Sequence, residues 1–185
     1  MKTTKKLVGI AAVFAMFIFG SCENFSPTVN VPLTSKAEFP LEPATGKNTR
    51  SETSILLTSW DFNQSIETII IEYGGDPEQI KESNIVSVTL TFAEGEQGVD
   101  LSSIFNSLQL KMDKIPATEE ELVAESAVIG ANSISFDLVK TNIFDYTSSD
   151  NDFTFLLYGD VNYDKLFSAI NLIVTVESKI VVSAL

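Results

Sequence analysis

The chain has 185 residues, of which 25 are Asp or Glu and 12 are Lys or Arg, so that its net charge is −13; it has one cysteine and no histidine. An acidic surface of this kind repels phosphate backbones, so we expect no nucleic-acid partner. Without histidine there is no Ser-His-Asp or Cys-His nucleophilic system and no histidine-ligated zinc, which leaves carboxylate chemistry or calcium. We therefore expect a protein that is not an enzyme and that needs no cofactor.

The first 21 residues have the order of a secretory signal. Lys2, Lys5 and Lys6 precede an apolar stretch of 14 residues at positions 7–20. This length is typical of a signal peptide and short for a membrane span. The small residues at positions 20 and 21 stand directly before Cys22, as they do before a cleavage site.

The ending Phe-Gly-Ser-Cys resembles the lipobox of bacterial lipoproteins, although Phe19 stands where these signals usually carry Leu, Val or Ile. The resemblance implies that residues 1–21 are removed and that Cys22 carries two or three acyl chains, enough for a stable membrane anchor. The alternative is a secreted protein that is cut elsewhere, with Cys22 as an incidental thiol. Lipidation also accounts for a lone cysteine without a disulfide partner.

A lipidated Cys22 predicts attachment to the cell outer membrane. Removal of the signal takes three basic residues and no acidic one, which leaves nine against twenty-five and a net charge of −16. Acidic residues after the lipidated cysteine resemble a surface-export signal, but only Glu23 is acidic here. The sequence therefore leaves both the periplasmic face and the cell surface open.

Residues 22–53 are predicted to be a flexible tether behind the lipidated Cys22. The segment is rich in Ser, Thr, Pro, Asn and Lys, with at most a short extended edge segment at 28–33. A flexible chain of this length spans roughly 30 Å. The domain, residues 54–185, would then stand clear of the bilayer.

The domain reads mainly as β-strands. Apolar and polar residues alternate, or β-branched and aromatic residues cluster, in six segments: 55–62, 85–92, 108–112, 132–139, 153–158 and 169–182. In the second of these, Val86, Val88, Leu90 and Phe92 share one parity and are predicted to face the core. Several short alternating strands with turn signals between them predict an antiparallel β-sandwich.

Four segments have helix signals. Residues 76–79 offer an Asp cap followed by Pro at the first helical position, residues 100–105 begin with an Asp cap, and residues 141–148 are a weaker case. In residues 65–73, Ser65 can cap a helix that Gly74 and Gly75 end, whereas three consecutive isoleucines favour a strand. We prefer the helix there.

The order of these segments resembles a known family. Asp-Leu-Ser-Ser-Ile-Phe leads into Leu-Gln-Leu-Lys-Met, and later Ile-Phe-Asp-Tyr and Ser-Asp-Asn-Asp-Phe-Thr-Phe precede a long final strand. Over about residues 55–185 this pattern resembles small lipoproteins of Bacteroidota with an immunoglobulin-like domain. The resemblance implies a mainly β fold, an immunoglobulin-like antiparallel β-sandwich with a few short helices at the loop ends, and it names no catalytic residue.

Asp160, Asn162 and Asp164 are weak candidates for a calcium site. Their spacing matches the opening of a calcium-binding loop, whose oxygen ligands come from such residues. No glycine follows Asp164, however, and the twelfth position is Asn171 instead of Glu. An acidic turn in which these side chains cap their own backbone is the preferred interpretation. The same holds for residues 150–152, Asp-Asn-Asp.

Two further groups have alternative interpretations. The run of acids at 119–121 is expected to be a solvated surface, because a glycosidase needs two carboxylates that face each other across a cleft. Trp60, Phe62, Tyr73 and Tyr158 could form an aromatic platform for sugars, but a single Trp in a sandwich usually packs in the core.

The sequence thus predicts a non-catalytic envelope module that binds a glycan or an envelope protein partner. The alternative is a subunit of a surface fibre or adhesin assembly that exchanges a β-strand, for which the N-terminal segment and residues 169–185 are the places to look. A hydrolase that uses only carboxylates would need a facing pair of acids, and the sequence indicates none.

Overall fold

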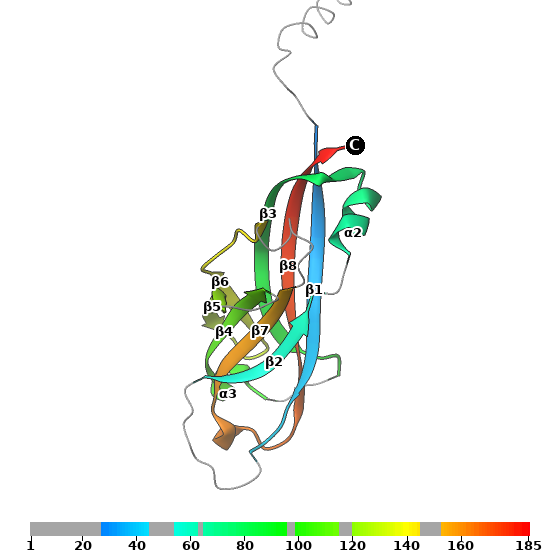
Figure 1. Ribbon diagram of the computed structural model, residues 1–185. Helices are drawn as coiled ribbons and strands as arrows, with labels where there is room; N and C mark the ends of the chain where they lie inside the picture. Colours follow the sequence, from blue (N-terminus) through cyan, green and yellow to red (C-terminus); the bar gives the residue numbers. More distant parts are fainter. Residues whose placement is uncertain (1–26, 45–53, 63–64, 96–98, 115–119, 145–152) are drawn as a thin grey trace, which may run out of the picture.

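The computed structural model describes residues 27–44, 54–62, 65–95, 99–114, 120–144 and 153–185. The described residues form one antiparallel sheet with the strand order β1-β8-β3-β6-β5-β4-β7-β2 (Figure 1). Its strands are β1 (Thr28–Leu41), β2 (Ile55–Asp61), β3 (Gly75–Phe92), β4 (Phe105–Lys114), β5 (Glu121–Ile129), β6 (Ser133–Leu138), β7 (Phe153–Val161) and β8 (Ile170–Ala184). The helices are α2 (Ile66–Glu72), α3 (Leu101–Ile104) and the 3-10 turn η1 (Tyr163–Lys165).

The sheet folds over on itself around one core. The long-strand half, β1, β8 and β3, runs the length of the molecule, and β4, β7 and β2 of the short-strand half (β6, β5, β4, β7 and β2) cross in front of its lower part (Figure 1). The two edge strands meet, because the indole N–H of Trp60 in β2 donates to Ser35 Oγ in β1 at 2.9 Å. The expected fold class is confirmed: the chain is mainly β, antiparallel and sandwich-like, with few and short helices.

Strand β1 lies where we expected the tether, and that prediction is wrong over residues 28–41. The expected edge segment at 28–33 exists and continues to Leu41. Odd positions face inward, with Val31, Leu33 and Phe39 buried, while even positions face out. Pro32 and Pro40 both occupy even positions of this edge strand, where a missing N–H can be tolerated on the unpaired side. These prolines hid a strand with regular alternation.

Strand β3 corrects two predictions. The capped helix expected at 76–79 is wrong, because these residues belong to an irregular start of β3; Asp76 instead accepts from the N–H of Glu78 at 3.0 Å. Val88 and Leu90 are buried as predicted, but Val86 is 55% exposed. A register shift between Ile85 and Ser87 reverses the parity, so that Ile85 faces the core instead.

The helix preferred at 65–73 is confirmed as α2. The Ser65 hydroxyl accepts from the N–H of Thr68, and Gly74 ends the helix with a φ of +76°, which favours glycine. The helix expected at 100–105 is shorter than predicted and gives way to β4 at Phe105. Residues 145–148, half of the segment 141–148, lie outside the described residues, and its first half contributes an isolated bridge between Asn84 and Asn142.

The other predicted strands are present, and β5 was not predicted. Its residues include Glu121 and Glu125, which made the segment read as a polar loop. Strands β7 and β8 supply much of the core, in which Phe155, Leu172 and Val174 are buried with Phe136 of β6. Among the described residues, no helix is both long and apolar enough to cross a membrane.

Candidate binding pocket

Within the described residues, the part of β3 before Thr89 has no neighbouring strand on one of its two edges. Strand β8 covers one side of β3 throughout, but β6 reaches the other side only at Thr89–Thr91. The chain after β6 partly fills the gap: the N–H of Ile85 donates to Thr141 O at 2.7 Å, and that of Ile143 donates to Ser83 O at 2.8 Å. A short added segment thus runs along this edge and leaves a hollow beside it.

This hollow is a cavity of about 420 Å³, within the usual range of small-molecule sites. Its described lining consists of two amides, an ammonium, a carboxylate, a hydroxyl and a phenyl ring, contributed by Lys81, Glu82, Ser83, Asn84, Asn142 and Phe144. Asn142 Oδ1 accepts from the N–H of Phe144 at 2.9 Å and so fixes the turn that carries the ring.

Ser83 is the most unusual residue of the pocket. It is only 1% exposed, and within the described part of the chain its hydroxyl has no hydrogen-bond partner. A buried hydroxyl without a partner costs about 1–3 kcal/mol of folding free energy. Its oxygen is enclosed by protein atoms, so this hydroxyl does not face the open space of the pocket.

The pocket's chemistry suits a ligand rich in hydroxyls. Amide side chains donate and accept at once, and a phenyl ring stacks on an apolar face. Glu82 is the one carboxylate in the described lining, whereas hydrolysis of a glycoside uses a pair of facing carboxylates.

A second polar cluster lies on the opposite half, across β4 and β7. Tyr158 donates to Glu120 Oε1 at 2.7 Å, and Lys111 Nζ contacts Glu120 Oε2 at 2.9 Å while lying 4.5 Å from the centre of the Tyr158 ring. The bonds from Lys111 and Tyr158 lower the pKa of Glu120, and the bond to Glu120 raises the pKa of Tyr158 to about 12. These three groups use their charges and hydrogen bonds on one another. We call Lys111, Glu120 and Tyr158 the brace, because they form a stabilising surface contact and not a reactive site.

The described acids of the run at 119–121 form ion pairs. Glu120 pairs with Lys111, and Glu121 pairs with Lys140, so both described acids have cationic partners. Glu119 lies outside the described residues.

The four aromatic residues considered as a sugar platform do not gather. Trp60 packs on Phe155 with ring centres 5.2 Å apart, and Phe62 stacks on Phe153 at 5.1 Å. Tyr73 lies just after α2, and Tyr158 belongs to the brace with Lys111. Core packing is therefore confirmed for Trp60 and Phe62.

The calcium candidates lie at the end of β7. Asp160 belongs to the strand, Asn162 donates its N–H to Ile104 O at 2.6 Å, and Asp164 lies in η1. The described residues contain no group of three or more Asp or Glu placed to hold a metal ion. Residues 150–152 and the predicted lipidation site Cys22 lie outside the described residues.

Sequence reasoning missed the pocket because its residues carry no motif. Lys81–Asn84 precede the alternating part of β3 and looked like a connection, and Asn142 and Phe144 follow β6 by several residues. The one available signal was the polar Ser-Asn pair directly before a run of alternating apolar residues.

Comparisons with known proteins add little. No protein-family model matches the chain, and no curated protein matches it. One similar solved structure is described as "Structure of infectious bursal disease virus Gx strain", with 8% identity and a TM-score of 0.31 over 85% of this chain and 32% of that chain. The chain thus spans about a third of the viral chain, and a likeness of this size carries no argument.

Proposed function

We propose that the protein is a lipid-anchored lipoprotein of the cell outer membrane whose β domain is a non-catalytic binding module. The observation that carries the anchor is the N-terminus, where a basic segment and 14 apolar residues lead to Gly20, Ser21 and Cys22. Acyl chains on Cys22 supply the membrane affinity that an acidic domain lacks.

The pocket beside β3 supports the binding role. Its amides and its phenyl ring match the hydroxyls and apolar faces of a glycan. An envelope protein that presents polar loops is the other class of partner.

The anchor is tested by the intact mass of protein extracted from membranes with detergent. We expect loss of residues 1–21 and a gain of acyl mass on the chain that begins at Cys22. The Cys22→Ser variant should remain unprocessed or leave the membrane fraction. A mature chain that begins elsewhere and keeps an unmodified Cys22 thiol would refute the proposal.

The binding role is tested with the mature protein on a glycan panel. Removing an amide from the pocket with Asn84→Ala or Asn142→Ala should weaken the binding of a glycan about five- to thirtyfold, since one lost hydrogen bond to a buried partner costs about 1–2 kcal/mol. Asn132→Ala is the matched control, because Asn132 is exposed in the turn before β6. Equal losses in all three variants would place the ligand elsewhere.

A fibre subunit that exchanges a strand is the second candidate, and the edge position of β1 favours it. Among the described residues, strand β1 pairs with β8 alone, along all 14 of its residues, and residues 42–54 connect it to β2. A neighbouring chain could supply an equivalent strand to the same β8 edge.

This candidate is tested by fixing β1 in place. Lys36 lies opposite Thr175 in the register, so Lys36→Cys with Thr175→Cys can form a disulfide between β1 and β8. Exchange predicts oligomers from the reduced protein and monomers from the oxidised protein. The same oligomeric state in both forms excludes exchange of β1.

A further inference from the structure

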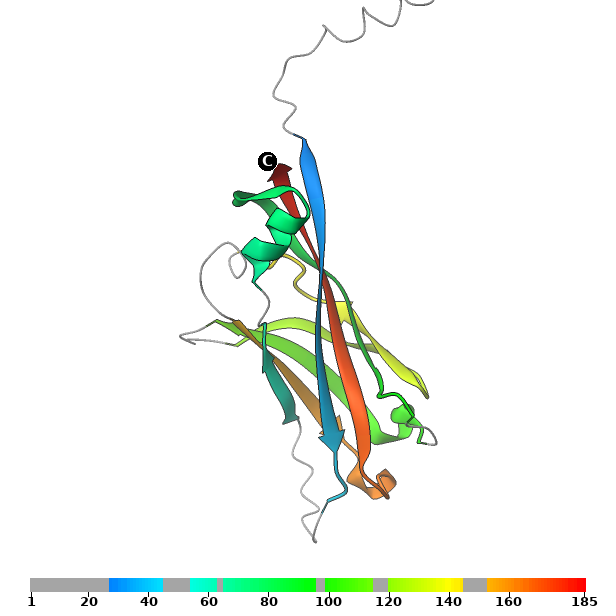
Figure 2. The same cartoon turned by 90° about the vertical axis from the view of Figure 1, so that its right-hand side faces the viewer.

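One end of the domain gathers the start of β1, the end of β8 and the helix α2 (Figures 1 and 2). The N–H of Ala184 donates to Pro27 O at 2.8 Å, and Ala184 also lies opposite Gly75 in the register. Since neighbouring strands are about 4.8 Å apart, the first residues of β1 lie roughly 10 Å from Gly75, which follows Glu72, the last residue of α2, by three positions.

The same end exposes apolar side chains of α2 and the residue that follows it. Ile70 is buried, and Ile66 and Ile69 pack against the core. In contrast, Ile71 is 50% exposed and Tyr73 is 49% exposed. The helix thus uses one side to cover the long-strand half and presents the other side outward.

The chain length between Cys22 and this end is short. Thr28 follows Cys22 by six residues, which can span at most about 22 Å in any conformation. A lipid on Cys22, as proposed above, therefore holds this end of the domain near the bilayer. Other parts of the domain lie farther away, because β1 alone is about 45 Å long at ~3.3 Å per residue.

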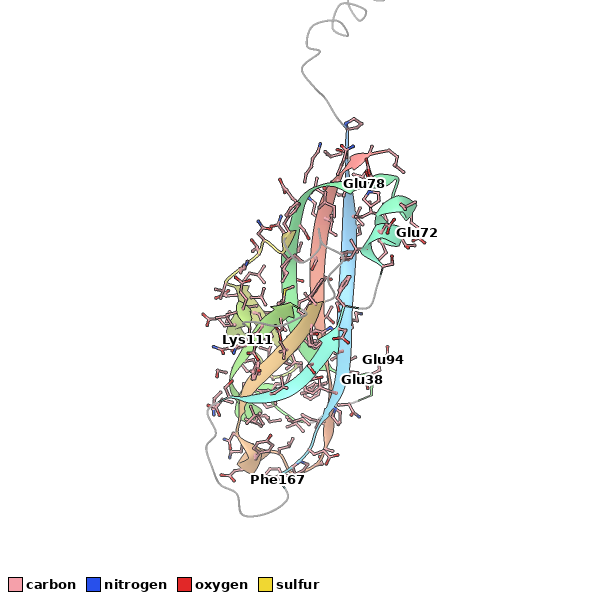
Figure 3. The ribbon with its side chains drawn as sticks, in the orientation of Figure 1. Glu38, Glu72, Glu78, Glu94, Lys111 and Phe167 are labelled. Atoms are coloured by element: carbon pink, nitrogen blue, oxygen red, sulfur yellow. The ribbon has the colours of Figure 1, made fainter. Side chains whose placement is uncertain are left out.

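From this placement we infer that the end formed by α2 and the start of β1 rests in the headgroup layer of the membrane that holds Cys22, with Ile71 and Tyr73 as its contacts. Tyrosine suits this layer because its ring is apolar and its hydroxyl remains hydrated. The inference rests on the proposed lipidation. It makes the long strands the axis that points away from the membrane, with Phe167 at the far end (Figure 3).

The charges at this end select the kind of lipid. Glu67, Glu72, Asp76 and Glu78 all lie on α2 or just after it, and Glu72 and Glu78 are seen at this end in Figure 3. Carboxylates repel an anionic surface. The contact is therefore made with zwitterionic phospholipid and weakens when anionic lipid is added.

The test uses single new thiols in the full lipidated protein. Lipidation converts Cys22, the one cysteine of the chain, to a thioether, so an introduced cysteine can be labelled selectively. Ile71→Cys and Tyr73→Cys report on the proposed contact. Phe167→Cys is the matched control, because Phe167 is 89% exposed at the opposite end. Each variant carries a fluorophore and is reconstituted in phosphatidylcholine vesicles that contain a headgroup-attached quencher.

We expect the labels at positions 71 and 73 to be quenched at least threefold more than the label at position 167, and we expect this difference to shrink with 30% phosphatidylglycerol. Equal quenching at the three positions, or stronger quenching at position 167, overturns the inference. The intact mass of the same samples separates the two proposals. An acylated, vesicle-bound protein without the difference refutes the orientation alone, whereas a protein without acyl mass refutes the anchor and the orientation with it.

Discussion

The two halves of the sheet bury their inner faces in the same core, but their strands differ in length. In the long-strand half, β1, β3 and β8 have 14, 18 and 15 residues, whereas the strands of the short-strand half have 6 to 10. The short strands can cover only part of the long ones. Beyond them, the inner face of the long-strand half needs another cover, and α2 provides it with Ile70, which lies against Gly75 and Val182.

This difference shows why the two ends of the molecule differ. Where both halves are present, aromatic side chains fill the space, as Trp60, Phe153 and Phe155 do. Where only the long strands remain, a helix of seven residues closes the core and leaves apolar residues on its outer side. The helix end therefore exposes Ile71 and Tyr73 on the outer side of its cover.

The largest effect among single substitutions should come from Phe155→Ala in the short-strand half. Phe155 is buried and contacts both Trp60 and Phe153, so its truncation should cost about 3–5 kcal/mol of unfolding free energy. If the halves share one core, denaturant melts followed by Trp60 fluorescence and by circular dichroism should shift together. Transitions that separate would mean that the halves unfold independently. Thr89→Ala, on the outward side of β3, is the control and should cost under about 1 kcal/mol.

A smaller effect should come from Gly75→Ala, which tests the cover that α2 provides. An added Cβ would lie 2.3 Å from Val182 Cγ2 and 3.0 Å from Ile70 Cγ2, so the helix or β8 must move. Overpacking of this kind costs about 1–3 kcal/mol. Thermal melts measure it, with Gln79→Ala on the exposed surface as the control. An unchanged melting temperature for Gly75→Ala would mean that α2 is loosely held.

The bulge in β3 predicts unequal effects for two neighbouring valines. Val88→Ala removes two buried carbons and should cost about 1.5–2 kcal/mol at ~0.8 kcal/mol for each. Val86→Ala should change stability by less than about 0.5 kcal/mol, because Val86 is largely exposed. Urea melts of both variants decide the register, and a larger loss at Val86 would restore simple alternation through residues 85–92.

The smallest effects concern pH and the brace on β4 and β7. The pKa of Glu120 is lowered by folding, so its stabilising contribution exists at neutral pH and is lost as pH falls through the folded pKa. The pKa of Tyr158 is raised to about 12, so its contribution exists below the ordinary value of about 10 and is lost as pH rises through 12.

Absorbance titration of tyrosinate tests this brace. The Tyr158→Phe variant should lose the component that ionises near pH 12, and Glu120→Gln should move that component to lower pH. A Tyr158 that ionises near pH 10 in the unmodified protein would show that the bond to Glu120 does not persist in solution. Glu120 is exposed and Tyr158 is partly exposed, so the change in stability at neutral pH should be slight.

The sequence predicted most strands, because alternation in β6, β7 and β8 is regular and each has one buried face. It predicted α2 from its cap and its closing glycines. The prediction failed where local sequence signals opposed the tertiary structure. Because of its prolines β1 was predicted to be a tether, and because of its glutamates β5 was not predicted to be a strand. An Asp-Pro pair led to the prediction of a helix at the start of β3. The pocket could not be predicted, because its lining comes from β3 and from the chain after β6, whose proximity depends on the sheet order.

The central claim is that β1 belongs to the domain and does not serve as a tether to the proposed lipid anchor. The most direct measurement compares the unfolding of two chains, residues 27–185 and residues 54–185. Without β1, the chain loses the burial of Val31, Leu33, Phe39 and Leu41, each worth about 1.5–3 kcal/mol against a typical total stability of about 5–15 kcal/mol. We predict a cooperative transition for the longer chain and none for the shorter one, with recovery when a peptide of residues 27–44 is added. Equal unfolding midpoints for the two chains would contradict the claim and return residues 28–41 to the role of a tether.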